Sequence, residues 1–291
     1  MLYQYIKLLR PHQWIKNGFV FLPPFFAGQI LDRCLWERLI IVFFAFSMIA
    51  SAVYCINDIR DVRADRLHPI KRKRPIASGR VSVRAAITIT VTLCAASLIL
   101  CTLLKNGYKV GLVLSCYLLI NIAYCFKLKQ YAIIDVLILS SGFVLRLAAG
   151  GVACSIELSP WIVSLTFLIA MFMAFAKRRD DVVILIDSGI STRKSIRRYN
   201  LQFLDMILSL IGAITIVSYM MYTISPEVME QLGCRYIYIT TLFVLAGILR
   251  YLQVTIVDNR SGSPTKILLK DRFIQCCIFC WIVLFLIIIY F

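Results

Sequence analysis

The sequence predicts an all-α integral membrane protein, and three observations support this fold class. First, 60% of the 291 residues are hydrophobic, which is more apolar surface than a soluble domain of this length can bury in its own core. Second, nine stretches are apolar and long enough to cross a bilayer as helices. Third, positive charges gather in alternate connections between these stretches, as in other multi-pass proteins.

The connections between the nine predicted spans differ in length, and those at 57–80, 177–201 and 258–271 are the long ones. The first is the least regular, because Lys16, Asn17, Pro23 and Pro24 interrupt it. The scattered cations near the N-terminus also argue against a cleavable signal peptide. We expect one membrane domain over residues 1–291. Its spans cover residues 13–32, 36–56, 81–104, 110–126, 133–153, 160–176, 202–224, 236–257 and 272–291.

The distribution of Lys and Arg predicts the orientation of the chain. Three connections, at 57–80, 177–201 and 258–271, are long, polar and basic. The positive-inside rule places them in the cytoplasm, together with the N-terminus, and the C-terminus outside. We therefore expect a protein of the cytoplasmic (inner) cell membrane with its active site on the cytoplasmic face. The outside connections hold few cations, namely Arg33, Arg38, Lys105, Lys109 and Arg235.

The overall charge and the cysteine count exclude several other function classes. The net charge is +17, but the excess lies beside membrane ends, where topology and anionic lipid explain it, so no nucleic-acid partner is expected. Most of the 11 Cys lie inside spans, where Cys behaves as a small apolar residue. We interpret the cluster at 276–280 in the same way. With only two His, a zinc site built from histidines is not expected.

The acidic half of the segment "NDIRDVRADRLHPIKRKRPIASG", residues 57–79, has helical spacing. Asn57, Asp61 and Asp65 recur at i, i+4 and i+8, and Asp58, Asp61 and Asp65 recur at i, i+3 and i+7. If the second span continues as a helix for two more turns, these carboxylates share one face and repel one another unless cations lie between them. Mg²⁺ prefers such oxygen ligands together with substrate phosphates. The sequence therefore predicts a magnesium site here.

The alternative for this segment is a solvated salt-bridge face, in which the Asp side chains pair with Arg60, Arg63 and Arg66. The basic half that follows has Pro69 and Pro75 on either side of four cations, residues 71–74. The prolines stiffen the turn, and constrained Arg and Lys suit phosphate binding. An ordinary lipid anchor is the competing interpretation of this loop, and we favour it for Lys73 and Arg80 taken alone.

Ionisable residues at membrane depth are functional candidates. Lys16 and Asn17 lie near the start of the first span, although Lys16 could equally snorkel to the interface. Lys127 and Lys129 flank an inside turn before Asp135 opens the next span. Arg146 lies about 16 Å deeper along that helix and is expected to need an anionic partner or a water-filled cavity.

The segment "AFAKRRDD" at 174–181 repeats the combination of acids and bases at the inside end of the sixth span. Lys177 and Arg178 could bind phosphate, and Asp180 and Asp181 could bind metal or merely balance their basic neighbours. Arg250, within two turns of the inside end of its span, is open to snorkelling, bundle pairing or a substrate contact.

Together these motifs resemble the UbiA superfamily of membrane prenyltransferases, and in particular its decaprenyl-phosphate phosphoribosyltransferase branch. The resemblance rests on "RPHQWIKN" at 10–17, the segment at 57–79, "KLKQYAIIDVLILSSGFVLRLAAGG" at 127–151, "AKRRDD", "TRKSIRRYN" at 192–200, "ILRY" at 248–251 and "KDRFIQ" at 270–275. It covers nearly the whole chain. One departure is visible, because the family pattern Lys-Arg-x-x-Glu ends here in Asp181, which leaves the role of this shorter acid open.

The resemblance implies a nine-transmembrane-helix bundle around a central cavity that opens to the cytoplasmic side and laterally to lipid. It also implies Mg²⁺-dependent chemistry on 5-phosphoribosyl diphosphate and a polyprenyl phosphate. The expected catalytic residues are Asp58, Asp61 and Asp65, with Asn57 and Asp181 as further metal ligands. The expected substrate- and phosphate-binding residues are Lys16, Asn17, Asn57, Arg66, His68, Lys71, Arg72, Arg74, Tyr124, Lys127, Lys129, Asp135, Arg146, Lys177 and Arg178.

In the expected reaction, the water-soluble donor enters from the cytoplasm and Mg²⁺ on the carboxylates neutralises its diphosphate. Cations from 66–74, with Lys177 and Arg178, hold the phosphates. The lipid phosphate attacks the anomeric carbon through an oxocarbenium-like transition state and diphosphate leaves. An ionised phosphate needs no strong general base, which fits the scarcity of His.

Two other functions compete with this reaction. A prenyltransferase would ionise a prenyl diphosphate and transfer the prenyl group to an aromatic or tetrapyrrole ring, but one diphosphate and a neutral ring need fewer cations than this chain supplies. A transporter of anionic lipids or metabolites would need paired, interrupted helices in two halves, and clustered acids would oppose an anion pathway. The sequence does not fix the lipid's length or the oligomeric state.

Overall fold

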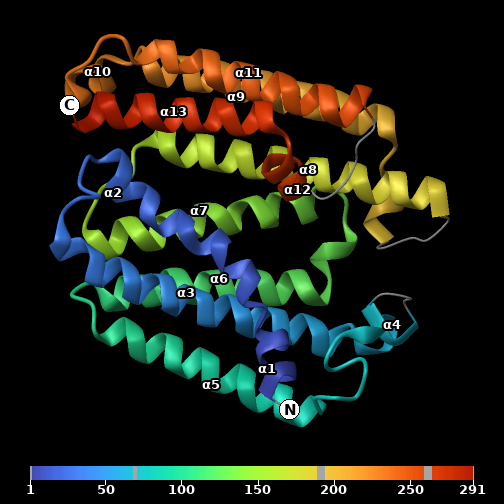
Figure 1. Cartoon of the computed structure of the whole chain (residues 1–291). Coiled ribbons are helices and arrows are strands. Elements are labelled where there is room, and N and C mark those ends of the chain that lie inside the picture. Colours follow the sequence, from blue (N-terminus) through green and yellow to red (C-terminus); the bar gives the residue numbers. More distant parts are fainter. Residues whose placement is uncertain (1, 68–70, 189–193, 259–263, 291) are drawn as a thin grey trace. The chain divides into compact units, whose positions relative to one another are not determined.

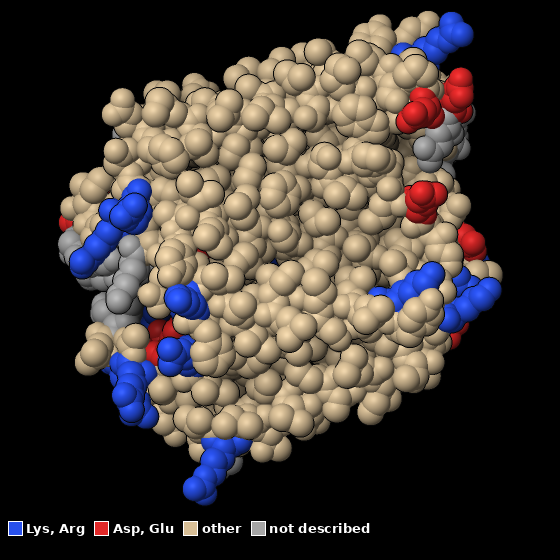
Figure 2. Space-filling model, turned by 180° about the vertical axis from the view of Figure 1, so that it is seen from behind, with Lys and Arg blue, Asp and Glu red and all other residues tan. Residues whose placement is uncertain are grey.

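The computed structural model describes residues 2–67, 71–188, 194–258 and 264–290, and within these ranges the chain is helical with no strand. Eight of the described helical segments are long and apolar enough to cross a membrane. On the face shown in Figure 2, Lys, Arg, Asp and Glu lie mainly toward the margins, and the broad middle of the face is formed by other residues. The expected all-α membrane protein is therefore confirmed.

The chain divides into two compact units, residues 1–129 with 141–158 and residues 130–140 with 159–291. The first unit holds α1 (Leu2–Leu9), η1 (Pro11–Phe21), α2 (Leu22–Phe26), α3 (Arg33–Arg60), α4 (Val62–Leu67), η2 (Lys71–Lys73), α5 (Val83–Thr102) and α6 (Gly107–Phe126). The short helix η3 (Leu128–Gln130) and the long helix α7 (Ile134–Cys154) each extend across a unit boundary. A single domain over the whole chain remains a prediction.

Helix α3 is the centre of the first unit, and it packs along α5 (Figure 1). It begins at an N-cap, where Asp32 accepts a hydrogen bond from the Cys34 amide, as helix starts commonly do. Its buried face includes Phe46 and Ile49, and Ser97 of α5 donates to the Ala45 carbonyl. This packing holds α3 in the first unit, and the acidic residues follow at its C-terminal end.

The first predicted span, residues 13–32, is not a continuous α-helix. It folds as the 3-10 helix η1 followed by the five-residue helix α2. Pro23 and Pro24 lie in the first turn of α2, because proline has no N–H to donate and is tolerated only where a helix starts. A Cβ at Gly150 of α7 would collide with the Val20 carbonyl, so α7 and η1 touch backbone to backbone. Nine spans and a central cavity remain predictions.

The second unit holds α8 (Pro160–Ser188), η4 (Lys194–Arg198), α9 (Leu201–Thr223), α10 (Pro226–Leu232), η5 (Ile237–Thr240), α11 (Thr241–Leu252), the π-helical turn η6 (Gln253–Val257), α12 (Pro264–Lys270) and α13 (Arg272–Tyr290). Helices α8 and α9 pack together, and Asn200 caps α9 by accepting from the Phe203 amide. Phe172, Leu204 and Leu208 belong to the buried core between them. This core holds α8 against α9.

Candidate active site

The acidic motif lies where α3 passes into α4. Asp58 is in the last turn of α3, Asp61 is its C-terminal cap, and Asp65 is in α4. Backbone hydrogen bonds from the Asp61 amide to Asn57 and from the Asp65 amide to Asp61 continue the helical pattern through the junction. The predicted continuation of this helix is confirmed. Asp58 and Asp65 are only 2% and 4% exposed, so both carboxylates are buried.

Basic side chains from three distant segments contact these carboxylates. Arg10 donates to Asp58 at 2.6 Å, and Arg74 bridges Asp58 at 3.1 Å and Asp65 at 2.7 Å through one nitrogen. Lys129 contacts Asp61 at 2.6 Å and the Asn57 amide oxygen at 3.4 Å. Cations therefore lie between the stacked acids, as electrostatics demands.

These partners differ from the neighbours that the salt-bridge alternative assigned. Arg66 donates to the Ala77 carbonyl at 3.3 Å, and the Arg60 guanidinium lies 5.3 Å from the centre of the Phe126 ring. Burial raises the pKa of the Asp65 carboxyl above its ordinary value, and the adjacent Arg74 guanidinium opposes that rise. The ion pair with Arg74 therefore favours the ionised form of Asp65, against the effect of burial.

The residue types of this cluster suit a hard divalent ion. Among the described residues, no three His, Cys, Asp or Glu side chains are gathered as a ready-made metal site. However, one Arg74 nitrogen is within hydrogen-bond distance of both Asp58 and Asp65, so a single positive centre fits between the two carboxylates. Mg²⁺ is usually held by one or two carboxylates together with substrate phosphates, and this pair can supply that donor set.

The basic loop after α4 is held by its own backbone. The Arg74 amide donates to Lys71, the Ser78 amide donates to Arg74, and Gly79 has a left-handed φ of 76°. Pro75 at the end of the basic run is buried, along with the two residues that follow it. Arg72 is exposed, whereas Arg74 turns inward to the acids. His68, a predicted substrate residue, lies outside the described residues.

Arg146 is buried in α7, and each of its three guanidinium nitrogens has a neutral hydrogen-bond partner. It donates to Asn17 at 2.8 Å, to the Gly142 carbonyl at 2.7 Å and to the Tyr117 hydroxyl at 3.1 Å. The Phe46 and Tyr117 rings lie 4.9 and 5.0 Å from its guanidinium carbon. Arg146 was expected to need an anionic partner or a water-filled cavity, and no anionic side chain is among these contacts. Cation–π attraction to the two rings stabilises the buried charge instead.

The remaining predicted residues of the first unit differ in exposure. Lys16 is half-buried, Tyr124 is buried at the end of α6, and Lys127 is exposed beside it. Asn17 also donates to Ser47 of α3 at 2.9 Å, so its amide joins η1, α3 and α7.

A second charged cluster lies in the second unit, around Arg178 of α8. Arg178 forms ion pairs with Asp135 at 2.8 Å and with Asp181 at 2.7 Å, and Lys177 lies 3.7 Å from Asp181. The Tyr199 hydroxyl donates to Asp135 at 3.3 Å and accepts from a backbone amide. Burial raises the pKa of Tyr199 to about 12, so this phenol stays protonated. Asp181 is thus ion-paired with two basic neighbours, and its role as a metal ligand remains a prediction.

Other charged residues of the second unit have structural partners. Arg179 pairs with Asp205 of α9 at 2.5 Å, and Arg250 pairs with Asp271 at 2.9 Å. The hydrogen bond from Arg250 lowers the pKa of the Asp271 carboxyl. The second oxygen of Asp180 is buried and has no hydrogen-bond partner in the described part of the chain.

Sequence reasoning missed three residues of these clusters, Arg10, Tyr199 and Asp205. Arg10 has a left-handed backbone, with φ 52° and ψ 57°, and its guanidinium also lies 5.1 Å from the centre of the Tyr54 ring. A non-glycine residue with positive φ is uncommon and often marks a functional position. A proline disfavours the right-handed helical conformation in the residue before it, and Arg10 precedes Pro11. This dipeptide is the feature of the sequence that points to an unusual backbone at Arg10.

Comparison with known proteins identifies the family. Residues 21–275 match the UbiA prenyltransferase family. The chain belongs to this family. It is 34% identical over 281 residues to a decaprenyl-phosphate phosphoribosyltransferase of Corynebacterium glutamicum, covering 95% of this chain and 84% of that one. It is 35% identical to the decaprenyl-phosphate phosphoribosyltransferase of Mycolicibacterium smegmatis, covering 95% and 89%.

Solved structures of UbiA homologues share the fold. A UbiA homologue from Archaeoglobus fulgidus bound to DMAPP and Mg²⁺ aligns with a TM-score of 0.72 and 20% identity, over 98% of this chain and 99% of that one. The same homologue bound to GPP and Mg²⁺ aligns with a TM-score of 0.68. The helical membrane fold and the transferase family are therefore established for this chain.

Proposed function

We propose that this UbiA-family protein transfers 5-phosphoribose from 5-phosphoribosyl diphosphate to a polyprenyl phosphate and releases diphosphate. The observation that carries the proposal is the 34–35% identity, over 95% of the chain, to decaprenyl-phosphate phosphoribosyltransferases. The abundance of basic side chains around the acidic motif supports it, because both substrates are phosphorylated.

In this proposal, Asp58, Asp61 and Asp65 provide oxygen ligands for Mg²⁺, with Asn57 beside them. The metal would neutralise charge on the departing diphosphate. Arg74 and Lys129 now contact these carboxylates. When the donor and the metal bind together, these two side chains would instead bind phosphate oxygens. Arg10 forms an ion pair with the buried Asp58 carboxylate. Lys177 and Arg178 are further proposed phosphate-binding residues.

The bond changes balance without a protein base. A lipid phosphate oxygen forms the new bond to the anomeric carbon, and the bond between that carbon and the diphosphate oxygen breaks with both electrons leaving on diphosphate. The attacking phosphate is already ionised at neutral pH, so no proton has to be removed. The protein's own contribution is to orient two anions against their mutual repulsion.

We further propose that the site faces the cytoplasm, where the water-soluble donor is found, with the N-terminus inside and the C-terminus outside. The distribution of Lys and Arg along the sequence supports this orientation. Cysteine-accessibility labelling in intact cells tests it. A residue of the 57–80 loop that reacts with a membrane-impermeant reagent from outside would overturn the orientation.

The deciding experiment supplies purified protein with radiolabelled 5-phosphoribosyl diphosphate and decaprenyl phosphate, with and without Mg²⁺. We expect label in a chloroform-soluble product only when Mg²⁺ is present. Asp61→Asn should abolish turnover, while Asp187→Asn, an exposed acid at the end of α8, serves as the matched control. Product from a prenyl diphosphate and an aromatic acid, with none from the ribosyl donor, would instead establish the prenyltransferase alternative.

A further inference from the structure

The chain just before η1 is fastened to one face of α3. Ser51 is fully buried on this face, where its hydroxyl accepts a hydrogen bond from the Trp14 indole at 3.0 Å and donates one to the Leu9 carbonyl at 2.9 Å. Asp58 lies about two turns further along the same face. Leu9 is therefore held where the next residue, Arg10, reaches the Asp58 carboxylate at 2.6 Å.

The guanidinium of Arg10 also contacts an aromatic ring. It lies 5.1 Å from the centre of the Tyr54 ring, which precedes Asp58 by about one turn of α3. Pro11 restricts the backbone that follows, because its ring leaves φ little freedom. Among the described residues, Asp58 is the one acid that Arg10 contacts. Moving Arg10 away from this acid would break all of these contacts.

The acidic motif and the bases that contact it carry equal and opposite charge. The three carboxylates are those of Asp58, Asp61 and Asp65, and the three bases are Arg10, Arg74 and Lys129. Lys71 adds a further positive charge that favours the ionised form of Asp65. Two of the three carboxylates are buried, where charges are screened much less than at the surface. A divalent cation that came alone would therefore add two positive charges to a group that is already neutral or positive.

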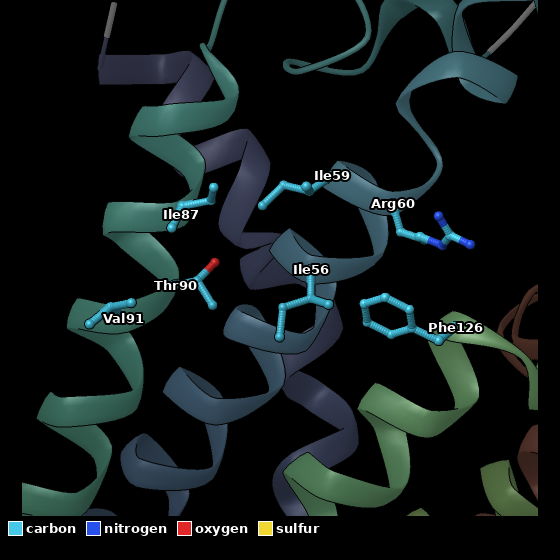
Figure 3. Close-up of a pocket in the computed structure, with 7 residues that line it drawn as sticks. All are labelled: Ile56, Ile59, Arg60, Ile87, Thr90, Val91 and Phe126. Atoms are coloured by element: carbon cyan, nitrogen blue, oxygen red, sulfur yellow. The ribbon is translucent and has the colours of Figure 1, made fainter.

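In the described part of the chain, Arg60 forms no ion pair with the motif, although it lies between Asp58 and Asp61 in the sequence. Its guanidinium is 5.3 Å from the centre of the Phe126 ring, beside a small apolar pocket between α3, α5 and α6 (Figure 3). The Arg60 side chain is exposed, so its charge is screened by water and salt. Arg60 therefore provides a matched control, because removing its charge leaves the ion pairs of the motif intact.

A diphosphate changes this charge balance. It brings negative charge of its own, which offsets that of Mg²⁺, and it offers oxygens to the bases that can leave the carboxylates. In the proposed reaction, Arg74 and Lys129 bind these phosphate oxygens, whereas Arg10 stays on Asp58. The metal and the diphosphate can then enter as a pair that adds no net positive charge.

We infer that Arg10 is a fixed counter-ion that keeps the acidic motif from binding a divalent metal before the diphosphate substrate arrives. The metal then enters together with the diphosphate, and Arg10 acts as a positioning residue that sets this order. The inference rests on the proposed function, because it describes how the metal and the donor of that reaction bind. It assigns Arg10 no contact with either substrate.

Equilibrium dialysis tests the inference without turnover. The full-length protein in detergent micelles is dialysed against radioactive Mn²⁺ as the probe, with or without 5-phosphoribosyl diphosphate and with no acceptor lipid. Wild-type protein should bind Mn²⁺ about tenfold or more tightly when the donor is present. Without the donor, Arg10→Gln should bind Mn²⁺ about tenfold or more tightly than wild type does, because a unit charge close to a divalent ion acts strongly even at an effective dielectric constant of about 20.

Three variants separate the charge of Arg10 from other effects. Arg10→Lys keeps the positive charge and should bind Mn²⁺ without the donor as weakly as wild type does. Arg60→Gln removes a charge from the same helix end and should change this binding by less than about twofold. Asp58→Asn, added to Arg10→Gln, should abolish the gain in Mn²⁺ affinity, because the gain requires the Asp58 carboxylate.

Several outcomes would overturn the inference. They are donor-free Mn²⁺ binding by Arg10→Gln that is equal to or weaker than that of wild type, and an Arg10→Lys variant that behaves like Arg10→Gln. Wild-type protein that binds Mn²⁺ equally well with and without a diphosphate substrate would also overturn it, and this comparison does not depend on the folding of any variant. If wild-type binding of Mn²⁺ responds to geranyl diphosphate but not to 5-phosphoribosyl diphosphate, the proposed function fails and the role of Arg10 stands.

Discussion

Replacing Arg146 by Met tests whether the buried arginine holds the first unit together. The substitution keeps an unbranched apolar stem but removes the guanidinium and its hydrogen bonds to Asn17, Gly142 and Tyr117. Hydrogen bonds between helices in a membrane contribute about 0.6 kcal/mol on average, and those in soluble proteins about 1 kcal/mol or more. Two of the lost bonds join α7 to other helices and the third lies within α7. Because buried acceptors are also left without a donor, we expect the unfolding free energy to fall by about 2–4 kcal/mol.

The assay is reversible unfolding in mixed micelles with increasing SDS, followed by circular dichroism. Arg250→Met is the matched control, because Arg250 also lies within a span but its ion pair with Asp271 leaves the arginine side chain 31% exposed. Such pairs contribute at most about 1 kcal/mol. Equal losses in the two variants, or a loss below about 1 kcal/mol for Arg146→Met, would refute the structural role derived from its contacts.

Three further predictions concern ionisable groups near the helix ends. Arg74→Gln removes the guanidinium that opposes the rise in the Asp65 pKa, so the acid limb of the pH–rate profile should move to higher pH; an unmoved limb would exclude this coupling. The pKa of Asp271 is lower in the folded protein than in the unfolded chain, so the ionised carboxylate stabilises the fold. This contribution is complete above the pKa of the unfolded chain and is lost as the pH falls through the pKa of the folded protein. Asp271→Asn should therefore lower the melting temperature at neutral pH but not in strong acid, by differential scanning fluorimetry. Tyr199→Phe should lower the unfolding free energy by about 1–2 kcal/mol, because it removes the hydrogen bond to Asp135 and the acceptor of the Ile133 amide. An unchanged SDS midpoint would contradict that.

The spans from residue 33 onward could be predicted because crossing a bilayer requires little more than apolar length. The segment at 13–32 shows the limit of that rule. It has the length and the hydrophobicity, but Asn17 bonds to Ser47 and Arg146, and two prolines start a new helix. The sequence shows that Asn17 and the two prolines interrupt this segment, but it does not predict that residues 11–21 form a 3-10 helix.

The acidic helix face could be predicted from its spacing alone, since helical periodicity is local. Its partners could not, because Arg10 and Lys129 are 48 and 68 positions away from the acids that they contact. Sequence reasoning looked for nearby cations and named Arg60, which instead lies over Phe126. Helix packing determines such long-range pairs.

Arg10 also allows electrostatics and backbone strain to be tested separately. Its left-handed conformation costs about 1–2 kcal/mol for an L-amino acid with a side chain, and glycine would avoid that cost. The chain has an arginine there all the same, and its guanidinium reaches a carboxylate that is 2% exposed. Arg10→Gly would relax the backbone but leave Asp58 short of one cation. If that variant melts no lower than wild type but no longer turns over, the arginine serves reactivity rather than folding.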